Sequence, residues 1–172
     1  MNDITLFALD RTAAEELAQD ALAFTGAHAL VLAPHEATVV AVADGTARLL
    51  SGGTAVMPWV GYLALEGAMR RAVGTCGFKA APDAARAVEI AYFTFPGEEG
   101  RGIATAMAEA LVGVAYAAAP QVAVVRAHTL PERNASCRVL EKVGFAHTGS
   151  VVDPEDGLVW RWERWVSHDG AE

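Results

Sequence analysis

The sequence of 172 residues contains only two cysteines, Cys76 and Cys137, too few for the disulfide framework of a small secreted domain. The two can in principle pair, but free thiols in a reducing compartment are the simpler interpretation. No apolar run reaches the roughly 20 residues that a membrane-spanning helix needs, so no membrane partner is expected. The N-terminal segment MNDITLFALD lacks the basic start of a secretory signal, and we therefore expect a cytoplasmic protein.

Positive charge is also scarce. There are 13 Lys and Arg residues against 21 Asp and Glu residues, and the net charge is −8. This balance argues against nucleic acid as a partner and is compatible with a cationic substrate. The five histidines have no metal-ligand spacing, so no metal is expected. With 53% hydrophobic and 20% charged residues, residues 1–172 are expected to fold as one globular domain.

The sequence does contain a regular succession of helix and strand patterns. Expected strands cover about 4–9, 59–65, 72–78, 87–95, 121–128, 145–152 and 158–166, and expected helices about 12–24, 101–117 and 134–143. The strands between positions 59 and 95 are joined by segments with Gly, Pro and Asp, which predicts an antiparallel meander. Strand 87–95, helix 101–117 and strand 121–128 form a β-α-β unit with a parallel strand pair. The order predicts an α/β fold, a mixed sheet with helices on its faces.

Helix ends are indicated at several places. The segment that starts at Thr12, Thr-Ala-Ala-Glu, has the spacing of a capping box, and Gly26 can end the helix that follows. Residues 34–52 are ambiguous, because the initial proline suits a helix start whereas TVVAV and an internal glycine do not suit a helix. We favour a helix there. Near the C-terminus, Gly144 can take a left-handed cap position with Phe145 folded back over the last turn.

The most informative stretch is VEIAYFTFPGEEGRGIA, residues 88–104. It joins an apolar strand that carries one acid, Glu89, to a turn with Gly100 and Gly102 and to the start of an amphipathic helix. Such a turn directs backbone N–H groups and the positive end of the helix dipole at one place, which predicts a phosphate or pyrophosphate site. The anion site beside a candidate base suggests an enzyme that binds a phosphorylated cofactor and removes a proton from a second substrate.

Two segments resemble a known family. VEIAYFTFPGEEGRGIATAMAEAL resembles the acyl-CoA-binding motif of the GNAT N-acyltransferase superfamily, and NASCRVLEKVGF resembles its next motif, in the version found in Rim-type N-terminal protein acetyltransferases. With the upstream hairpin, the resemblance covers about residues 59–166. It implies a three-layer αβα fold whose central sheet is mostly antiparallel and contains one splayed parallel strand pair. It also implies an acetyl-CoA-dependent N-acetyltransferase in which an amine attacks the thioester directly in a ternary complex.

The resemblance also implies a set of cofactor contacts. The strand end would pair its backbone with the pantetheine arm, the turn would bind the pyrophosphate through backbone N–H groups, and Arg101 could add a charge-assisted contact. Asn134 would either hydrogen-bond the pantetheine arm or serve as a helix N-cap. The residues expected at acetyl-CoA are Phe93, Thr94, Phe95, Gly100, Arg101, Gly102, Ile103, Ala104, Thr105 and Asn134.

The turn departs from the family pattern. The pattern reads Q/R-x-x-G-x-G/A, and Glu99 stands in its first place here, directly after Glu98. Two acids beside a pyrophosphate should weaken its binding unless their side chains point away. A dinucleotide-binding turn is disfavoured as an alternative, because Thr105 stands where that fingerprint needs a third Gly or Ala.

Acyl transfer needs a neutral amine and therefore a general base, and a general acid can protonate the leaving thiolate. Glu89 is the candidate base, because an acid in an apolar strand is costly unless it is partnered or functional; the alternative is a salt-bridged strand residue. Ser136 is the candidate acid by resemblance to Rim-type members, since Glu141 stands where other members have a tyrosine. Tyr92 is a further phenol, expected on the opposite strand face from Glu89. His128 is a base, a ligand contact or a packed residue.

The acceptor is left open between a protein N-terminus and a small amine such as an amino acid, polyamine or aminoglycoside. Trp160 and Trp162 share a strand face and form either core or a wall of the acceptor pocket, where aromatic rings suit a cationic amine. The rival interpretation is a non-catalytic acyl-CoA-binding or regulatory module, which the acids at 98 and 99 and the missing tyrosine favour. Both a monomer and a homodimer are compatible with the sequence.

Overall fold

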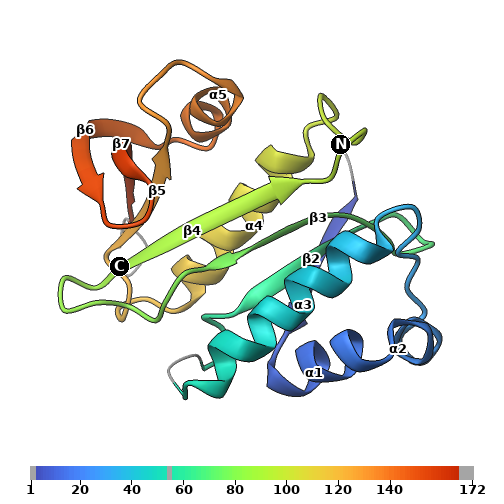
Figure 1. Ribbon diagram of the computed structural model, residues 1–172. Coiled ribbons are helices and arrows are strands. Elements are labelled where there is room, and N and C mark those ends of the chain that lie inside the picture. Colours follow the sequence, from blue (N-terminus) through green and yellow to red (C-terminus); the bar gives the residue numbers. More distant parts are fainter. Residues whose placement is uncertain (1–2, 54–55, 167–172) are drawn as a thin grey trace, which may run out of the picture.

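Seven strands form one sheet in the computed structural model, which describes residues 3–53 and 56–166 (Figure 1). The strands lie in the order β1-β2-β3-β4-β5-β7-β6. Their bounds are β1 Ile4–Leu9, β2 Gly61–Glu66, β3 Arg71–Phe78, β4 Ala87–Thr94, β5 Val124–Thr129, β6 Ala146–Asp153 and β7 Gly157–Trp165. The helices are α1 Arg11–Gln19, α2 Ala21–His28, α3 Glu36–Ser51, α4 Ile103–Ala117 and α5 Ala135–Lys142.

One strand pair determines where a ligand can enter the sheet. All neighbouring strands are antiparallel except β4 and β5, which confirms the predicted mixed sheet and the meander of β2, β3 and β4. The parallel pair is short, with register contacts only from Ala87–Val124 to Glu89–Arg126. Beyond Glu89 the two strands diverge, as Figure 1 shows. The divergence leaves the second half of β4 unpaired on its β5 side.

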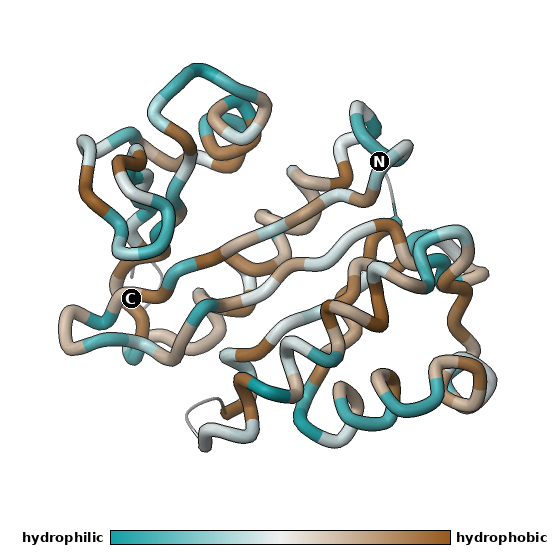
Figure 2. The backbone as a smooth tube through the Cα atoms, viewed as in Figure 1, coloured by the Kyte–Doolittle hydropathy of each residue, from teal (hydrophilic) through white to brown (hydrophobic). Residues whose placement is uncertain are grey.

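Hydrophobic cores lie on both faces of the sheet. In β2, Leu63 and Leu65 pack with α1, α2 and α3, whereas Tyr62 and Ala64 pack with the core around α4. This alternation is the two-residue period of a strand buried on both faces. Hydrophilic residues gather instead in the segment before α5 and in the turn between β6 and β7 (Figure 2). Both cysteines are free and buried.

The N-terminal helix prediction was wrong in its boundaries. The segment forms two helices, because the side chains of Asp10 and Asp20 accept the backbone N–H groups of Ala13 and Ala23. Each aspartate therefore starts a helix of its own, and the capping box at Thr12 is not used. The glycine at 26 lies inside α2, which ends where Ala29 adopts a left-handed conformation.

The other helix predictions agree with the structure. The ambiguous segment is helix α3, which ends at Gly52 as expected. The end of α5 is a Schellman motif: the N–H of Phe145 donates to the carbonyl of Leu140 at 2.9 Å, and Gly144 has a φ of 84°. Helix α4 begins only at Ile103, because the residue before it is a left-handed glycine.

Candidate active site

The turn after β4 leads into the N-terminus of α4 through three left-handed glycines. Gly97, Gly100 and Gly102 have φ values of 86°, 75° and 79°, which L-residues adopt only with strain. No side chain caps the first turn of α4, and no acid stands in that turn. A Cβ added at Gly100 or Gly102 would meet nothing within 4 Å. The helix therefore presents its first N–H groups to open space, which suits an anion.

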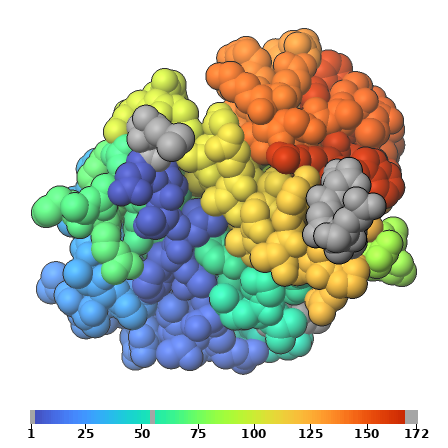
Figure 3. Space-filling view, turned by 180° about the vertical axis from the view of Figure 1, so that it is seen from behind, coloured from blue at the N-terminus to red at the C-terminus, as the bar shows by residue number. Residues whose placement is uncertain are grey.

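A groove of about 420 Å³ lies in front of this helix end, which we call the cofactor groove. Figure 3 shows the surface notched between the start of α4 and helix α5. The expected cofactor residues that line it are Phe93, Thr94, Gly100, Gly102, Ile103, Ala104 and Thr105. Two basic residues of α5, Arg138 and Lys142, line it as well. The sequence analysis did not identify them as candidate cofactor residues, although their i, i+4 spacing places them on one helix face.

The structure places three expected cofactor residues elsewhere. Phe95 is fully buried, and its N–H donates to the carbonyl of Val73 at 3.0 Å. Asn134 is the N-cap of α5, accepting the N–H of Cys137 at 3.1 Å, and lies at the diverging strands. Arg101 forms ion pairs with acids, described next, and does not line the groove.

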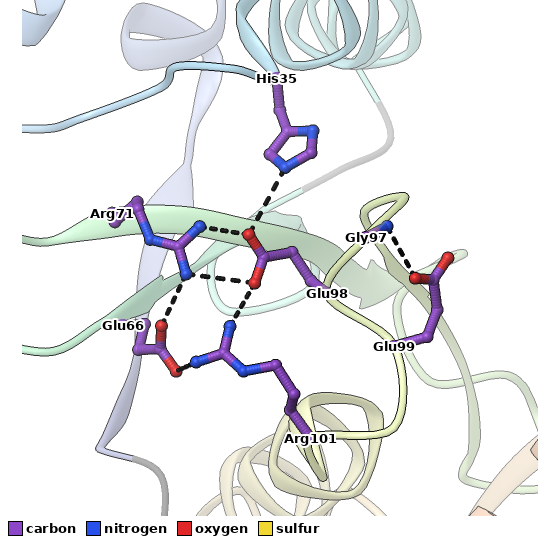
Figure 4. Close-up of polar contacts among 7 residues, drawn as sticks. All are labelled: His35, Glu66, Arg71, Gly97, Glu98, Glu99 and Arg101. Atoms are coloured by element: carbon purple, nitrogen blue, oxygen red, sulfur yellow. Dashed lines mark hydrogen bonds and ion pairs between the residues drawn. The ribbon is translucent and has the colours of Figure 1, made fainter.

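A partly buried group of charges holds the turn to the sheet (Figure 4). Glu98, only 8% exposed, accepts hydrogen bonds from Arg71 and Arg101. Glu66 accepts from the same two guanidinium groups, at 2.8 and 2.6 Å. His35 places its Nε2 at 3.7 Å from Oε1 of Glu98. The hydrogen bonds from Arg71, aided by Arg101, lower the pKa of Glu98 to about 2. We call these five residues the Glu98 cluster.

The two acids of the turn therefore differ. The charge of Glu98 is compensated by two arginines, so its expected repulsion of a pyrophosphate is offset. Glu99 is exposed, and its one partner among the described residues is the N–H of Gly97, at 2.7 Å. Figure 4 shows its carboxylate turned away from the Glu98 cluster. The negative charge of Glu98 is therefore compensated. The charge of Glu99, which is the departure from the family pattern, is not.

A second hollow, of about 370 Å³, lies between the diverging strands. Glu89, Tyr92 and His128 line it together with Asn134 and Ser136 from the start of α5. Ser136 also lines the cofactor groove, so its side chain stands at the border between the two hollows. We call this second hollow the splay hollow.

Glu89 has both of the properties weighed in the sequence. Its Oε1 lies 2.7 Å from Nζ of Lys79 and 3.0 Å from Nδ1 of His128, so it is an ion-paired strand residue. It also lines the splay hollow and remains 24% exposed. Both contacts are made by Oε1, so Oε2 has no hydrogen-bonding partner among residues 3–53 and 56–166. His128 is a partner of Glu89 and not only a packed residue.

Tyr92 lies where the hollows meet. It lines the cofactor groove, the splay hollow and a third hollow of about 610 Å³ beneath α3. Its hydroxyl donates to the backbone carbonyl of Ser136 across 3.5 Å. Burial raises the pKa of Tyr92 to about 12, so the phenol stays protonated at neutral pH and can donate a hydrogen bond. Strand alternation in the sequence did not indicate this central place.

Trp160 and Trp162 line none of these three hollows. Trp162 is buried and donates from Nε1 to Oγ1 of Thr129 at 3.0 Å, and Trp160 packs against the same core. The core interpretation applies to both. Within the described ranges no cluster of three or more His, Cys, Asp or Glu could hold a metal ion, and no helix is long and apolar enough to cross a membrane.

The sequence matches a known family over most of its length. The family described as "Acetyltransferase (GNAT) domain" matches residues 9–146. A search of curated proteins finds no match.

Several solved structures are similar to this chain. One is RimL, a ribosomal L7/L12 alpha-N-protein acetyltransferase in complex with coenzyme A, at 19% identity, TM-score 0.63 and 96% coverage of both chains. Another is the aminoglycoside acetyltransferase AAC(6')-Ib with coenzyme A, at 16% identity, TM-score 0.66 and 95% coverage of both chains. A chimera of the spermidine N-acetyltransferase SpeG from Vibrio cholerae and hSSAT has 16% identity, TM-score 0.65 and 95% coverage of both. These likenesses show a shared fold, and the three proteins are named for three different acceptors.

Proposed function

The chain belongs to the GNAT acetyltransferase family, and from this premise we propose that it transfers an acetyl group from acetyl-CoA to a primary amine. One observation carries the proposal: the cofactor groove, the splay hollow and the hollow beneath α3 meet at Tyr92. At Tyr92, a thioester bound in the cofactor groove can meet an amine bound in the hollow beneath α3. Glu89 and Ser136 line the splay hollow between them.

Binding of acetyl-CoA is proposed along the cofactor groove. The N–H groups from Gly100 to Thr105 would bind the pyrophosphate, since the helix end is uncapped. Arg138 and Lys142 would add positive charge to the phosphates. The unpaired side of β4 would pair with the amide groups of the pantetheine arm.

Direct transfer is proposed for the chemistry. The amine nitrogen attacks the thioester carbonyl, the C–N bond forms, and the C–S bond breaks. Glu89, through the oxygen that carries no partner, accepts the amine proton directly or through water. The leaving thiolate takes a proton from solvent, or from the hydroxyl of Ser136, which then regains its proton from solvent. Lys79 and His128 act as positioning residues, because they hold the other oxygen of Glu89.

The test is a free-thiol assay with acetyl-CoA and a panel of primary amines, run on the wild type and on Glu89→Gln. We expect the substitution to lower kcat/KM by about 100-fold or more, because general-base catalysis contributes at least that much. Glu109→Gln is the matched control, because Glu109 is an exposed acid on α4. Equal rates in the three proteins would remove Glu89 from the mechanism. Binding of acetyl-CoA by calorimetry without thiol release for any amine would instead support the binding module.

A further inference from the structure

The hollow beneath α3 exists because small residues meet across three strands. Gly61 pairs with Gly77, and Gly77 pairs with Ala91, so the three lie side by side in β2, β3 and β4. All three line the hollow, which α3 covers with Val42 and Thr46 (Figure 1). Because these residues have little or no side chain, they leave space between the sheet and α3 unfilled, and a Cβ added at Gly61 would lie 3.6 Å from Oγ1 of Thr46. We call this space the acceptor hollow.

The lining of the acceptor hollow is apolar over most of its extent. Helix α3 supplies Val42 and Leu49, and β4 supplies Phe93, which is 51% exposed. The described residues that line it include two charged ones, Lys79 and Glu155. An ammonium group placed against these apolar side chains would lose part of its hydration without gaining an ionic partner, which is costly.

The charged side chains lie toward one end. Glu89, Ala91 and Phe93 alternate along β4 and therefore share one face of the strand. The carboxylate of Glu89 and the phenyl ring of Phe93 thus lie at opposite ends of this group of three residues. Lys79 is paired with Glu89, and the β6–β7 turn adds Glu155 to this hollow and Asp156 to the splay hollow. This end of the hollow thus has three acids beside Lys79 and the imidazole of His128. This end attracts a single ammonium group, and the rest of the hollow accepts an uncharged body.

From this polarity we infer that the acceptor is a small primary amine with one positive charge, carried on an aromatic or aliphatic body. The inference rests on the proposed transfer reaction and names its substrate class. The ammonium group would lie at the Glu89 end, where deprotonation is needed, and the body would lie against Phe93 and α3. Polyamines and aminoglycosides are excluded as preferred acceptors, because their further ammonium groups would have to enter the apolar part.

Hexylamine and 1,6-diaminohexane test this inference, because they share one chain length and differ by one ammonium group. Phenethylamine and spermidine form a second pair. We expect kcat/KM for the monoamine of each pair to exceed that for its partner by at least about tenfold, since a second charge must be desolvated. Equal use, or preference for the polycation, would overturn the inference while leaving acetyl transfer intact.

A binding measurement keeps the inference testable apart from turnover. Trp59 lines the acceptor hollow, so its fluorescence in the CoA-loaded protein reports on occupancy. We expect phenethylamine to bind at least about tenfold more tightly than spermidine, for the same reason of desolvation. Tighter or equal binding of spermidine would refute the substrate class. Absence of thiol release with every amine would refute the proposed function, and the fluorescence result would still decide the inference.

A variant pair locates the effect. Leu49→Asp adds an acid to the lining, and Leu22→Asp makes the same change at an exposed position of α2; the two leucines are 76% and 82% exposed. We expect Leu49→Asp to reduce the preference for hexylamine over 1,6-diaminohexane by about tenfold, because the second ammonium gains a partner. Leu22→Asp should leave the preference unchanged. An unchanged preference in Leu49→Asp would contradict the assignment of this hollow.

Discussion

At the scale of the residue, the partners of a side chain decide what its charge does to a ligand. Glu98 and Glu99 are neighbours in the sequence, yet the first is held by Arg71 and Arg101, whereas the second accepts the backbone N–H of Gly97. From the sequence alone, both are acids expected to weaken binding of an anion at the turn. In the fold, the uncompensated negative charge at the cofactor groove belongs to Glu99.

Replacement of that one acid is therefore expected to strengthen cofactor binding. Glu99→Gln should lower the Kd for CoA by about two- to tenfold at low salt, because a charge facing the pyrophosphate is removed, and by less at high salt because of screening. Calorimetric titration with CoA at two ionic strengths measures this. Glu109→Gln makes the same change on the exposed side of α4. An equal gain in both variants would point to net charge instead of the turn.

At the scale of the element, the start of α4 combines a backbone requirement with a binding role. Gly102 is the N-cap, with a φ of 79°, and no side chain of the fold caps the helix. Gly53, after the end of α3, has the same φ of 79°, and an added Cβ meets nothing within 4 Å at either glycine. The two glycines have the same strained backbone conformation, but only Gly102 lies at the cofactor groove.

A comparison of the two glycines therefore distinguishes the effect of backbone strain on stability from the effect on CoA binding. Gly102→Ala and Gly53→Ala should each lower the free energy of unfolding by about 1 kcal/mol, because an L-residue is forced into the left-handed region. Only Gly102→Ala should weaken CoA binding, by about tenfold or more, because its methyl group holds phosphate away from the N–H groups. Urea unfolding and calorimetry provide the two readouts. A similar CoA affinity in both variants would argue against a pyrophosphate site at this turn.

At the scale of the whole molecule, the Glu98 cluster joins segments that lie far apart in the sequence. His35 precedes α3, Glu66 and Arg71 stand in β2 and β3, and Glu98 and Arg101 belong to the turn before α4 (Figure 4). The cluster thus connects helix α3, which covers the acceptor hollow, with the turn at the cofactor groove. Loss of Glu98 would leave the two guanidinium groups with Glu66 as their shared acceptor and would remove one of the two carboxylates that hold them.

The stability of the fold should therefore depend on pH through Glu98. Its pKa of about 2 is below the value of about 4.3 in an unfolded chain, so its contribution is present above pH 4.3 and is lost as the pH falls toward 2. We expect the free energy of unfolding of the wild type to exceed that of Glu98→Gln by roughly 3 kcal/mol at pH 6 and by about half of that at pH 3. Urea unfolding over this range measures the difference. A difference that is constant with pH would show that Glu98 does not titrate within this cluster.

Sequence alone determined the features that depend on nearby residues. The meander of β2, β3 and β4, the helix after Gly102 and the Schellman motif at Gly144 follow from periodicity and from single residues with special backbone freedom. The family motif indicated the same turn that the structure leaves uncapped. The first helix was misplaced because Asp10 and Asp20 compete locally with Thr12 as caps, and only the fold shows which of them is used.

Tertiary structure alone decided which residues meet. The acceptor hollow requires Gly61, Gly77 and Ala91 to align, and this alignment is a matter of register between strands. Likewise, Arg101 could have faced a phosphate, but β2 brings Glu66 and β3 brings a second arginine to the turn. The side chain of Arg101 pairs with Glu66 and Glu98 instead. The physical reason is the same in both cases. Contacts between segments far apart in the sequence depend on how the sheet and helices pack, and no local pattern encodes that packing.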